Sequence, residues 1–263
     1  MSDASDQASR WRLLLDALAE RRQLSVADAA ALLGVSPATV RRDFGELARQ
    51  QLATRTHGGI VATSVAYDLP ARYRVNQGDP IERIGQAAAA LVEPGSVVAF
   101  NGGTTTSAVA RHLGRRTDLG QNGAGNVIVV TNALNIASEM VLRPAFSTLV
   151  IGGVARPESY ELHGRYAEIV LRDLRVHRLF LGVNAFSAAR GAACNHLGEA
   201  GINAEMVKRA KEVTVVASGA KLGRLALATI CEADAVSTLI TDESAPADEV
   251  ARLEEIGVDV VRV

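Results

Sequence analysis

From residue 81 to the C-terminus, short apolar segments alternate with longer helix-like stretches, and this alternation constrains the fold more than any other feature of the chain. The apolar segments are residues 96–101, 126–132, 147–153, 177–183, 212–218, 236–242 and 258–263. Strands that are apolar on both faces must be covered on both faces, and intervening helices allow them to pair in parallel. The sequence therefore predicts a mostly parallel α/β domain over residues 81–263.

The chain before residue 62 follows a different pattern. Apolar residues recur at helical spacing up to about residue 52, which predicts three short helices. Ser25 and Ser36 are suited to cap the second and third helices, and Gly34 permits a turn between them. The segment LATRTHGGIVA then alternates around a Gly-Gly pair and predicts a two-stranded hairpin, or wing.

The domain boundaries follow from these two patterns. Residues 1–61 form the predicted N-terminal helical domain. Residues 62–80 lack periodicity and contain two prolines and a glycine, so we predict a linker there. The α/β domain then occupies residues 81–263.

Two helices joined by a short glycine-containing turn are typical of DNA-binding proteins whose second helix enters the major groove. The candidate groups on the third helix and the wing are Ser36, Thr39, Arg41, Arg42 and Arg55. Such side chains bond phosphates and base edges. The alternative is a plain three-helix unit with solvated arginines, and spacing alone favours DNA binding by roughly two to one. Asp43 can orient a neighbouring arginine or form an ordinary surface ion pair.

Composition narrows the function classes. The chain has 263 residues and a formal net charge of -1, which argues against indiscriminate coating of nucleic acid or membrane. Cys194 and Cys231 give neither metal-ligand spacing nor a disulfide framework, so we expect no metal site and no cofactor. The chain shows neither a secretory signal nor an apolar run long enough to span a bilayer, so we expect a cytoplasmic protein without a membrane partner.

A second candidate site lies in the α/β domain, where the first strand runs into the segment GGTTTSAVARHL. Gly103, Thr104 and Thr105 offer backbone N–H groups and hydroxyls to an anion at a helix N-terminus. An ordinary capped turn explains this pattern about half the time. Ligands of parallel sheets gather at the carboxyl ends of strands, where this chain places Asn101, Thr131, Asn132, Gly153, Asn184 and Lys221. Lys221 can meet a phosphate, although the sequence slightly favours a solvated loop lysine.

The segments VSPATVRRDFGEL and RTHGGIV closely resemble the winged helix of the DeoR family of bacterial transcriptional regulators. The Arg-Arg-Asp triplet after TV and the later His-Gly-Gly are hallmarks of that family. The resemblance implies that Arg41, Arg42 and His57 lie at the DNA surface.

The elements GTT, TNA, GG, GAKLG and ITD occur in the order expected for the sensor domain of the same family, which is similar in fold to ribose-5-phosphate isomerase. This resemblance implies that a phosphorylated sugar or related metabolite binds near Gly103, Thr105 and Lys221 and changes DNA affinity. Asn101 and Asn184 stand where the family usually has Asp, and ASGAK also lacks a usual acid. We therefore expect a pocket that has lost negative charge.

These observations predict a sequence-specific repressor of a carbohydrate-metabolism operon. It would bind a double-stranded operator as a homo-oligomer, either a dimer or a tetramer, and respond to a phosphorylated sugar. The alternative is a sugar-phosphate isomerase or hydrolase with an accessory helical domain, for which Asp242 and Glu199 are the available carboxylates. Asparagines in place of acids make a catalytic set hard to assemble, so we predict that the protein is not an enzyme. A nucleophilic pair of Cys194 and His196 is less favoured than a packing cysteine beside a loop histidine.

Overall fold

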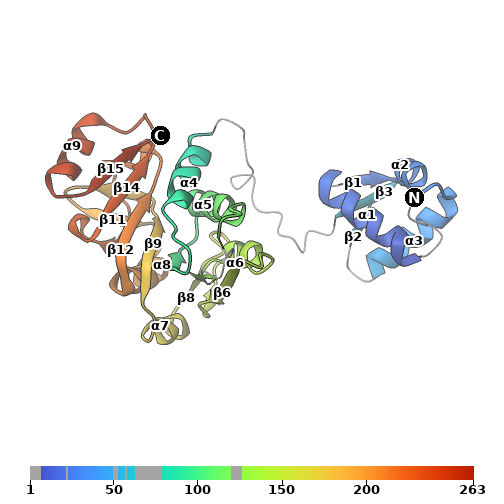
Figure 1. The fold of residues 1–263 in the computed structure, drawn as a ribbon, viewed down its shortest axis with the longest axis horizontal. Helices are drawn as coiled ribbons and strands as arrows, with labels where there is room; N and C mark the ends of the chain where they lie inside the picture. The colour runs from blue at the N-terminus through green and yellow to red at the C-terminus, as the bar shows by residue number, and fades with distance from the viewer. Residues whose placement is uncertain (1–6, 22, 50–52, 57, 63–78, 120–125) are drawn as a thin grey trace. The chain divides into compact units, whose positions relative to one another are not determined.

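The computed structural model describes residues 7–21, 23–49, 53–56, 58–62, 79–119 and 126–263 (Figure 1). Its contacts divide the chain into two compact units, residues 1–71 and 72–263. We call them the N-terminal unit and the sensor unit.

The N-terminal unit consists of helices around a small antiparallel sheet. Its elements are α1 (Gln7–Arg21), β1 (Gln23–Ser25), α2 (Val26–Leu33), α3 (Pro37–Arg49), β2 (Ala53–Thr56) and β3 (Gly59–Ala62). The predicted helices and hairpin are confirmed, but the sheet gains a further strand because β1 pairs with β3 in the order β1-β3-β2. Leu24 lies opposite Ile60 in this pairing, and both side chains are buried in the core of the unit.

Local chemistry explains where the helices of this unit begin and end. Ser25 caps α2, because its Oγ accepts a hydrogen bond from the Asp28 N–H at 3.1 Å. Gly34 ends α2 with φ +66°, a left-handed conformation that glycine adopts without steric cost. The Oγ of Ser36 then accepts from the Thr39 N–H at 3.2 Å and opens α3.

The sensor unit is built on a seven-stranded sheet with the order β15-β14-β12-β9-β4-β5-β6. All neighbouring pairs are parallel. The strands are β4 (Val97–Phe100), β5 (Val127–Thr131), β6 (Phe146–Val150), β9 (Val176–Gly182), β12 (Ala210–Val216), β14 (Thr238–Thr241) and β15 (Asp259–Arg262). Each of these strands lies in one of the predicted apolar segments or overlaps it closely, and the parallel α/β prediction is confirmed.

Helices cover both faces of this sheet (Figure 1). One face packs against α4 (Pro80–Ala90), α5 (Thr104–Gly114) and α6 (Leu134–Met140). The other packs against α7 (Arg165–Leu171), α8 (Leu197–Arg209) and α9 (Ala247–Glu255). Alternate residues of β9 divide between the two cores, because Leu179 and Leu181 join one while Phe180 joins the other and stacks on Phe100 at 5.1 Å between ring centroids.

Short elements complete the sensor unit. An antiparallel sheet has the order β10-β11-β13, formed by β10 (Ala185–Ser187), β11 (Gly191–Cys194) and β13 (Ala228–Cys231). A hairpin joins β7 (Val154–Ala155) to β8 (Leu162–His163), and two 3-10 turns are η2 (Gly219–Lys221) and η3 (Ala233–Ala235). In the part of the chain that the structure describes, every helix is too short or too polar to cross a membrane.

The order of the strands identifies where a ligand would bind. From β4 the chain proceeds to β5 and β6 on one side of the sheet, whereas β9, β12, β14 and β15 extend from the other side of β4. The strand order therefore reverses between β4 and β9. In open parallel sheets the crevice beyond the carboxyl ends of such strands is the usual ligand site.

Candidate functional sites

Helix α3 presents two arginines to solvent. Val40, Phe44 and Leu47 are buried at a spacing that turns one face of the helix into the core. Arg41 and Arg42 lie on the other side and are exposed. The exposed arginines therefore have the placement expected of a helix that contacts a groove.

Asp43 follows the two arginines but takes no part in that surface. Its side chain is only 2% exposed, and it accepts hydrogen bonds from Arg10 at 2.9 and 3.1 Å. The indole of Trp11 donates a third bond at 3.2 Å. Both interpretations of Asp43 from the sequence are therefore wrong, because the carboxylate fastens α1 to α3 from inside the unit.

The other predicted DNA-binding residues differ in exposure. Ser36 is exposed and Thr39 is half-buried, and their hydroxyl oxygens lie 3.0 Å apart at the start of α3. Arg55 is exposed on β2. His57 lies outside the described residues.

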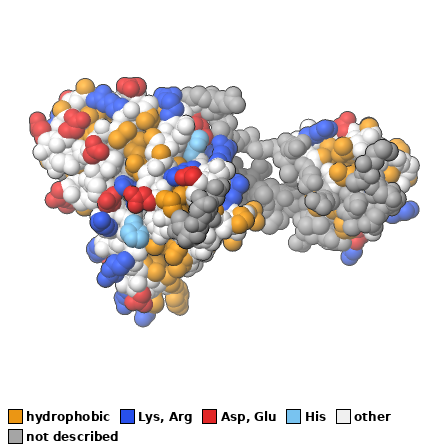
Figure 2. All heavy atoms as spheres, viewed as in Figure 1, with side chains coloured by type: hydrophobic (Ala, Val, Ile, Leu, Met, Phe, Trp, Pro, Cys, Tyr) orange, Lys and Arg blue, Asp and Glu red, His pale blue; other side chains and the backbone are white. Residues whose placement is uncertain are grey.

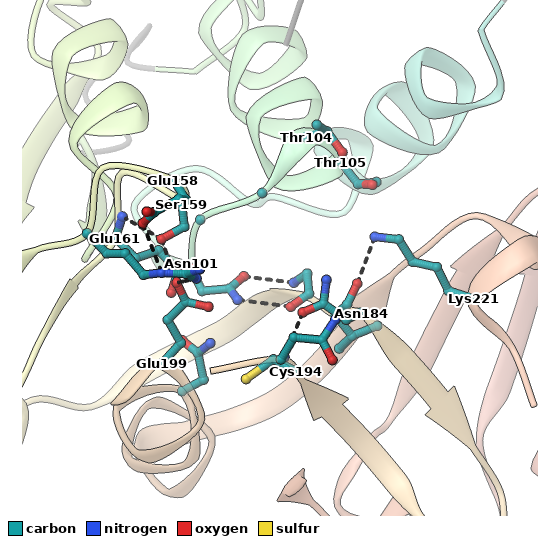
Figure 3. Close-up of a pocket in the computed structure, with 17 residues that line it drawn as sticks. Asn101, Thr104, Thr105, Glu158, Ser159, Glu161, Asn184, Cys194, Glu199 and Lys221 are labelled. Atoms are coloured by element: carbon teal, nitrogen blue, oxygen red, sulfur yellow. Dashed lines mark hydrogen bonds and ion pairs between the residues drawn. The ribbon is translucent and has the colours of Figure 1, made fainter. Parts of the chain in front are cut away.

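A cavity of about 350 Å³ opens in the sensor unit beyond the carboxyl ends of β4 and β9 (Figure 3). It brings together six of the predicted ligand-binding residues, namely Asn101, Gly103, Thr104, Thr105, Asn184 and Lys221. The others, Thr131, Asn132 and Gly153, are not among its lining residues. The cavity occupies the point where the strand order reverses, which is where the sheet topology places a ligand.

The N-terminus of α5 forms one wall of the cavity. Gly103 precedes the helix with φ +142°, a conformation that other residues rarely adopt, and no described side chain caps the helix. The hydroxyls of Thr106 and Ser107 donate instead to the carbonyl of Gly103 at 3.1 and 2.7 Å. The first N–H groups of α5 thus remain available to an anion in the cavity.

Lys221 approaches the same cavity from η2. Its Nζ donates to the carbonyl of Val183 at 2.7 Å, and burial lowers the pKa of this lysine. The interpretation as a solvated loop lysine is therefore wrong. Asp242 supports the turn, because it accepts from the Gly219 N–H at 3.0 Å and from the Ser244 N–H at 2.9 Å.

Asn101 has a role that an aspartate could not fill. Its Nδ2 donates to the carbonyl of Gly182 at 2.9 Å, and its Oδ1 accepts from the Gly182 N–H at 2.7 Å. This pair of bonds joins the ends of β4 and β9, and it requires both a donor and an acceptor on one side chain. Asn184 is exposed, and its Oδ1 accepts from the Asn195 N–H at 3.0 Å.

The remaining predicted residues do not line the cavity but contact residues and segments close to it. Thr131 is fully buried and donates to the carbonyl of Phe100 at 2.8 Å. Asn132 is also buried and donates to Glu161 at 3.2 Å. A side chain at Gly153 would meet the backbone of His163 at 2.6 Å, so this glycine permits the β7–β8 hairpin to close.

One polar wall of the cavity consists of residues that were not predicted from the sequence to bind the effector, although Glu199 and Cys194 were considered as catalytic groups. It consists of residues from the loop 156–161, the end of β11, the turn after β11 and α8, namely Arg156, Glu158, Ser159, Glu161, Cys194, Asn195, Glu199 and Asn203. Three of these are glutamates, so the cavity carries acidic groups in addition to the positions where Asn101 and Asn184 replace the usual acids. The sequence of the loop 156–161 has no periodic pattern that would have identified it as part of a site. In the structure its Tyr160 adopts φ +60°, which is unusual for a residue other than glycine.

Glu161 is the most perturbed group in this wall. Burial and the charge of Glu199 raise its pKa to about 8, although Asn132, Asn203 and the backbone of Gly102 donate hydrogen bonds to it. It packs so closely on Gly102 that a side chain there would meet its Cγ at 2.4 Å. Glu199 instead accepts from Arg156 at 2.7 Å.

Cys194 and His196 lie close together without forming a nucleophile and base. The thiol of Cys194 donates to the backbone carbonyl of His196 at 3.3 Å, and burial raises its pKa. The Nδ1 of His196 accepts from the Glu199 N–H at 3.2 Å and caps α8. These contacts agree with a packing cysteine.

Acidic and basic side chains are interspersed over the face of the sensor unit that Figure 2 shows. This mixture fits the net charge of -1. A broad basic surface of the kind that holds a nucleic acid without sequence preference is not seen on that face.

Comparison with known proteins identifies the family of each of the two domains. Residues 10–65 match the model of the DeoR-like helix-turn-helix domain, and residues 80–243 match that of the DeoR C terminal sensor domain. The chain is 30% identical to the "Putative aga operon transcriptional repressor" of Escherichia coli O157:H7, over 97% of this chain and 94% of the relative. It is 26% identical to the "Glycerol-3-phosphate regulon repressor" of Escherichia coli K12, over 91% of this chain and 92% of the relative.

A solved ribose-5-phosphate isomerase from Methanocaldococcus jannaschii aligns with 56% of this chain and 55% of its own, at 16% identity and a TM-score of 0.39. That likeness is too distant to bear on function. The two domain matches and the relatives aligned over nearly the whole chain lead to one conclusion: the chain belongs to the DeoR family of transcriptional regulators.

Proposed function

We propose that this chain represses a carbohydrate-metabolism operon and that a phosphorylated sugar or related metabolite changes its affinity for the operator. The observation that carries the proposal is the cavity in which Lys221 and the open N-terminus of α5 converge. A cation and free backbone N–H groups are the partners that a phosphate needs. The relative named for a glycerol-3-phosphate regulon points to the same class of signal.

The DNA-binding surface in this proposal comprises Ser36, Thr39, Arg41, Arg42, Arg55 and His57. Arg41 and Arg42 are its centre, because both are exposed while their neighbour Asp43 is engaged inside the unit. An exposed guanidinium on such a helix can bond guanine or phosphate.

The effector is held, in our proposal, by the cavity residues Asn101, Gly103, Thr104, Thr105, Asn184 and Lys221, with Thr131, Asn132 and Gly153 supporting their loops. The protein is not an enzyme and needs no cofactor or metal. Asp242 supports η2 through backbone hydrogen bonds and so is not a free catalytic carboxylate. The isomerase or hydrolase alternative would require turnover of a sugar phosphate.

Assembly follows from the size of the DNA interface. One winged helix buries too little surface on DNA for the affinity of a typical specific regulator. A homo-oligomer, either a dimer or a tetramer, would place two winged helices on an operator that contains a repeated half-site. We expect this assembly to act in the cytoplasm. The proposed organisation is a DNA-binding domain at 1–61, a linker at 62–80 and a sensor domain at 81–263. Ala62 ends β3 and Pro80 begins α4, and residues 63–78 of the proposed linker lie outside the described residues.

Fluorescence anisotropy with the intergenic DNA upstream of the protein's own gene tests DNA binding. The wild type should bind this DNA more tightly than random duplex at several salt concentrations. Arg41→Ala and Arg42→Ala should each cost about 1–3 kcal/mol of binding free energy. Arg175→Ala removes an exposed arginine of the sensor unit and should change little. Equal affinity of the wild type for both duplexes would contradict a local operator.

The same assay tests the effector. A phosphorylated sugar that binds the wild type should change its DNA affinity, because a ligand shifts a two-state equilibrium only through differential binding. Lys221→Ala should reduce the affinity of the protein for this sugar phosphate by about tenfold or more. Turnover of any sugar phosphate by the purified protein would favour the enzyme alternative instead.

A further inference from the structure

The wall of the cavity that contains Glu161 is rich in hydrogen-bond acceptors. Figure 3 shows Glu161 and Glu199 on the side of the cavity away from Lys221. The cation of this wall, Arg156, is already engaged, because it pairs with Glu199 at 2.7 Å and with Glu158 at 3.2 Å. Glu161 forms no ion pair with any of the described residues. Its carboxyl group accepts hydrogen bonds from the side-chain amides of Asn132 and Asn203 and from the backbone N–H of Gly102.

An unsatisfied acceptor lies beside this carboxyl group. Asn203 is 1% exposed and lines the cavity, and its amide donates to Glu161. Its Oδ1 has no hydrogen-bond partner in the part of the chain that the structure describes. A buried carbonyl oxygen without a partner costs free energy, so a donor supplied by a ligand in the cavity would stabilise this atom.

A primary ammonium group matches these acceptors in number and charge. It carries three N–H donors and one positive charge. Here it would meet the carboxylates of Glu161 and Glu199 and the Oδ1 of Asn203. Burial favours the uncharged form of Glu161, and the charge of Glu199 adds to that effect. A ligand cation would offset both influences and hold Glu161 ionised at neutral pH. A ligand hydroxyl offers one donor and no charge.

We propose that the effector carries a primary ammonium group as well as a phosphate, and that Glu161, Glu199 and Asn203 bind the ammonium while Lys221 and the N-terminus of α5 bind the phosphate. The inference rests on the proposed function, since it assigns the second end of the same ligand. It narrows the effector to the class of phosphorylated amino sugars.

Matched ligand pairs test this assignment by isothermal titration calorimetry on the full-length protein at pH 7. The pairs are glucosamine 6-phosphate with glucose 6-phosphate, galactosamine 6-phosphate with galactose 6-phosphate, and mannosamine 6-phosphate with mannose 6-phosphate. In at least one pair the amino member should bind about tenfold more tightly or better, because a buried charge-assisted bond replaces a neutral one. Its binding should also release close to one proton more than the hydroxyl member, because Glu161 becomes ionised.

Two variants separate this role from a structural one. Glu161→Gln should reduce the preference for the amino member to about threefold or less and abolish the extra proton release. Glu168→Gln removes an exposed carboxylate of α7 and should retain both. Lys221→Ala should weaken both members of a pair alike.

The outcomes distinguish the inference from the proposed function. Equal binding of both members, or a preference that survives in Glu161→Gln, would overturn the ammonium assignment. If Lys221→Ala still weakened both members in that case, the phosphate site would stand. If all six compounds failed to bind at millimolar concentration, the inference and the sugar-phosphate effector would both be wrong.

Discussion

Replacing Glu161 by Gln should change how the stability of the sensor unit depends on pH. Glu161 is 4% exposed, and its pKa is raised from 4.5 to about 8 by burial and by the charge of Glu199. Between these two values the folded protein retains a proton that the unfolded chain releases. The free energy of unfolding of the wild type therefore falls as pH rises through this window.

The magnitude follows from the width of the window. One pH unit corresponds to about 1.4 kcal/mol for one proton, so the contribution of Glu161 changes by up to about 3 kcal/mol between pH 5.5 and pH 8. Glutamine has the shape of the protonated carboxyl group but does not ionise. The difference in unfolding free energy between the variant and the wild type should grow by that amount over the same range, in favour of the variant.

Urea denaturation at pH 5.5, 7 and 8 measures this difference. Far-UV circular dichroism follows the whole chain, in which the sensor unit holds most of the helices and strands, whereas the fluorescence of Trp11, the single tryptophan of the chain, follows the N-terminal unit. The fluorescence transitions should show no pH-dependent difference between the two proteins, which provides an internal control. A difference in unfolding free energy that stays constant from pH 5.5 to 8 would refute a neutral Glu161 in the folded state.

Three further substitutions have consequences that follow from single contacts. Asp43→Ala leaves two donors of α1 without their buried partner and should cost the N-terminal unit about 3 kcal/mol or more, measured by the Trp11 transition in urea. Asn101→Asp places a carboxylate against the carbonyl of Gly182 and should destabilise the sensor unit by about 1–3 kcal/mol. Gly102→Ala forces Glu161 to move and should destabilise the sensor unit by roughly 1–3 kcal/mol. If the urea midpoint of a variant equals that of the wild type within error, the contact assigned to that residue does not contribute to stability as stated.

The elements of both units could be predicted from the sequence because their signals are local. Continuous apolar segments such as 177–183 must be buried on both sides wherever they occur, and helices between them permit only a few arrangements. Gly34 and Ser36 end and begin helices through contacts within four residues, so their roles were also visible in advance. The family resemblance rests on the same short segments.

Only the tertiary structure decided what the individual polar side chains do. Asp43 lies beside two arginines in sequence yet bonds to Arg10, which is 33 residues away, because the helical period turns it inward. Lys221 enters the cavity because η2 is fastened to Asp242 at the end of another strand. Such pairings join positions that no local pattern relates.

The acidic wall of the cavity is the clearest case of contacts that local sequence patterns do not predict. Glu161 and Glu199 come from a loop and from α8, and their charges interact only because the fold brings these elements together. The sequence determined which segments are strands and helices through hydrophobic period and capping. The charge and hydrogen-bonding capacity of the cavity depend on long-range packing, because residues far apart in the sequence supply its polar groups.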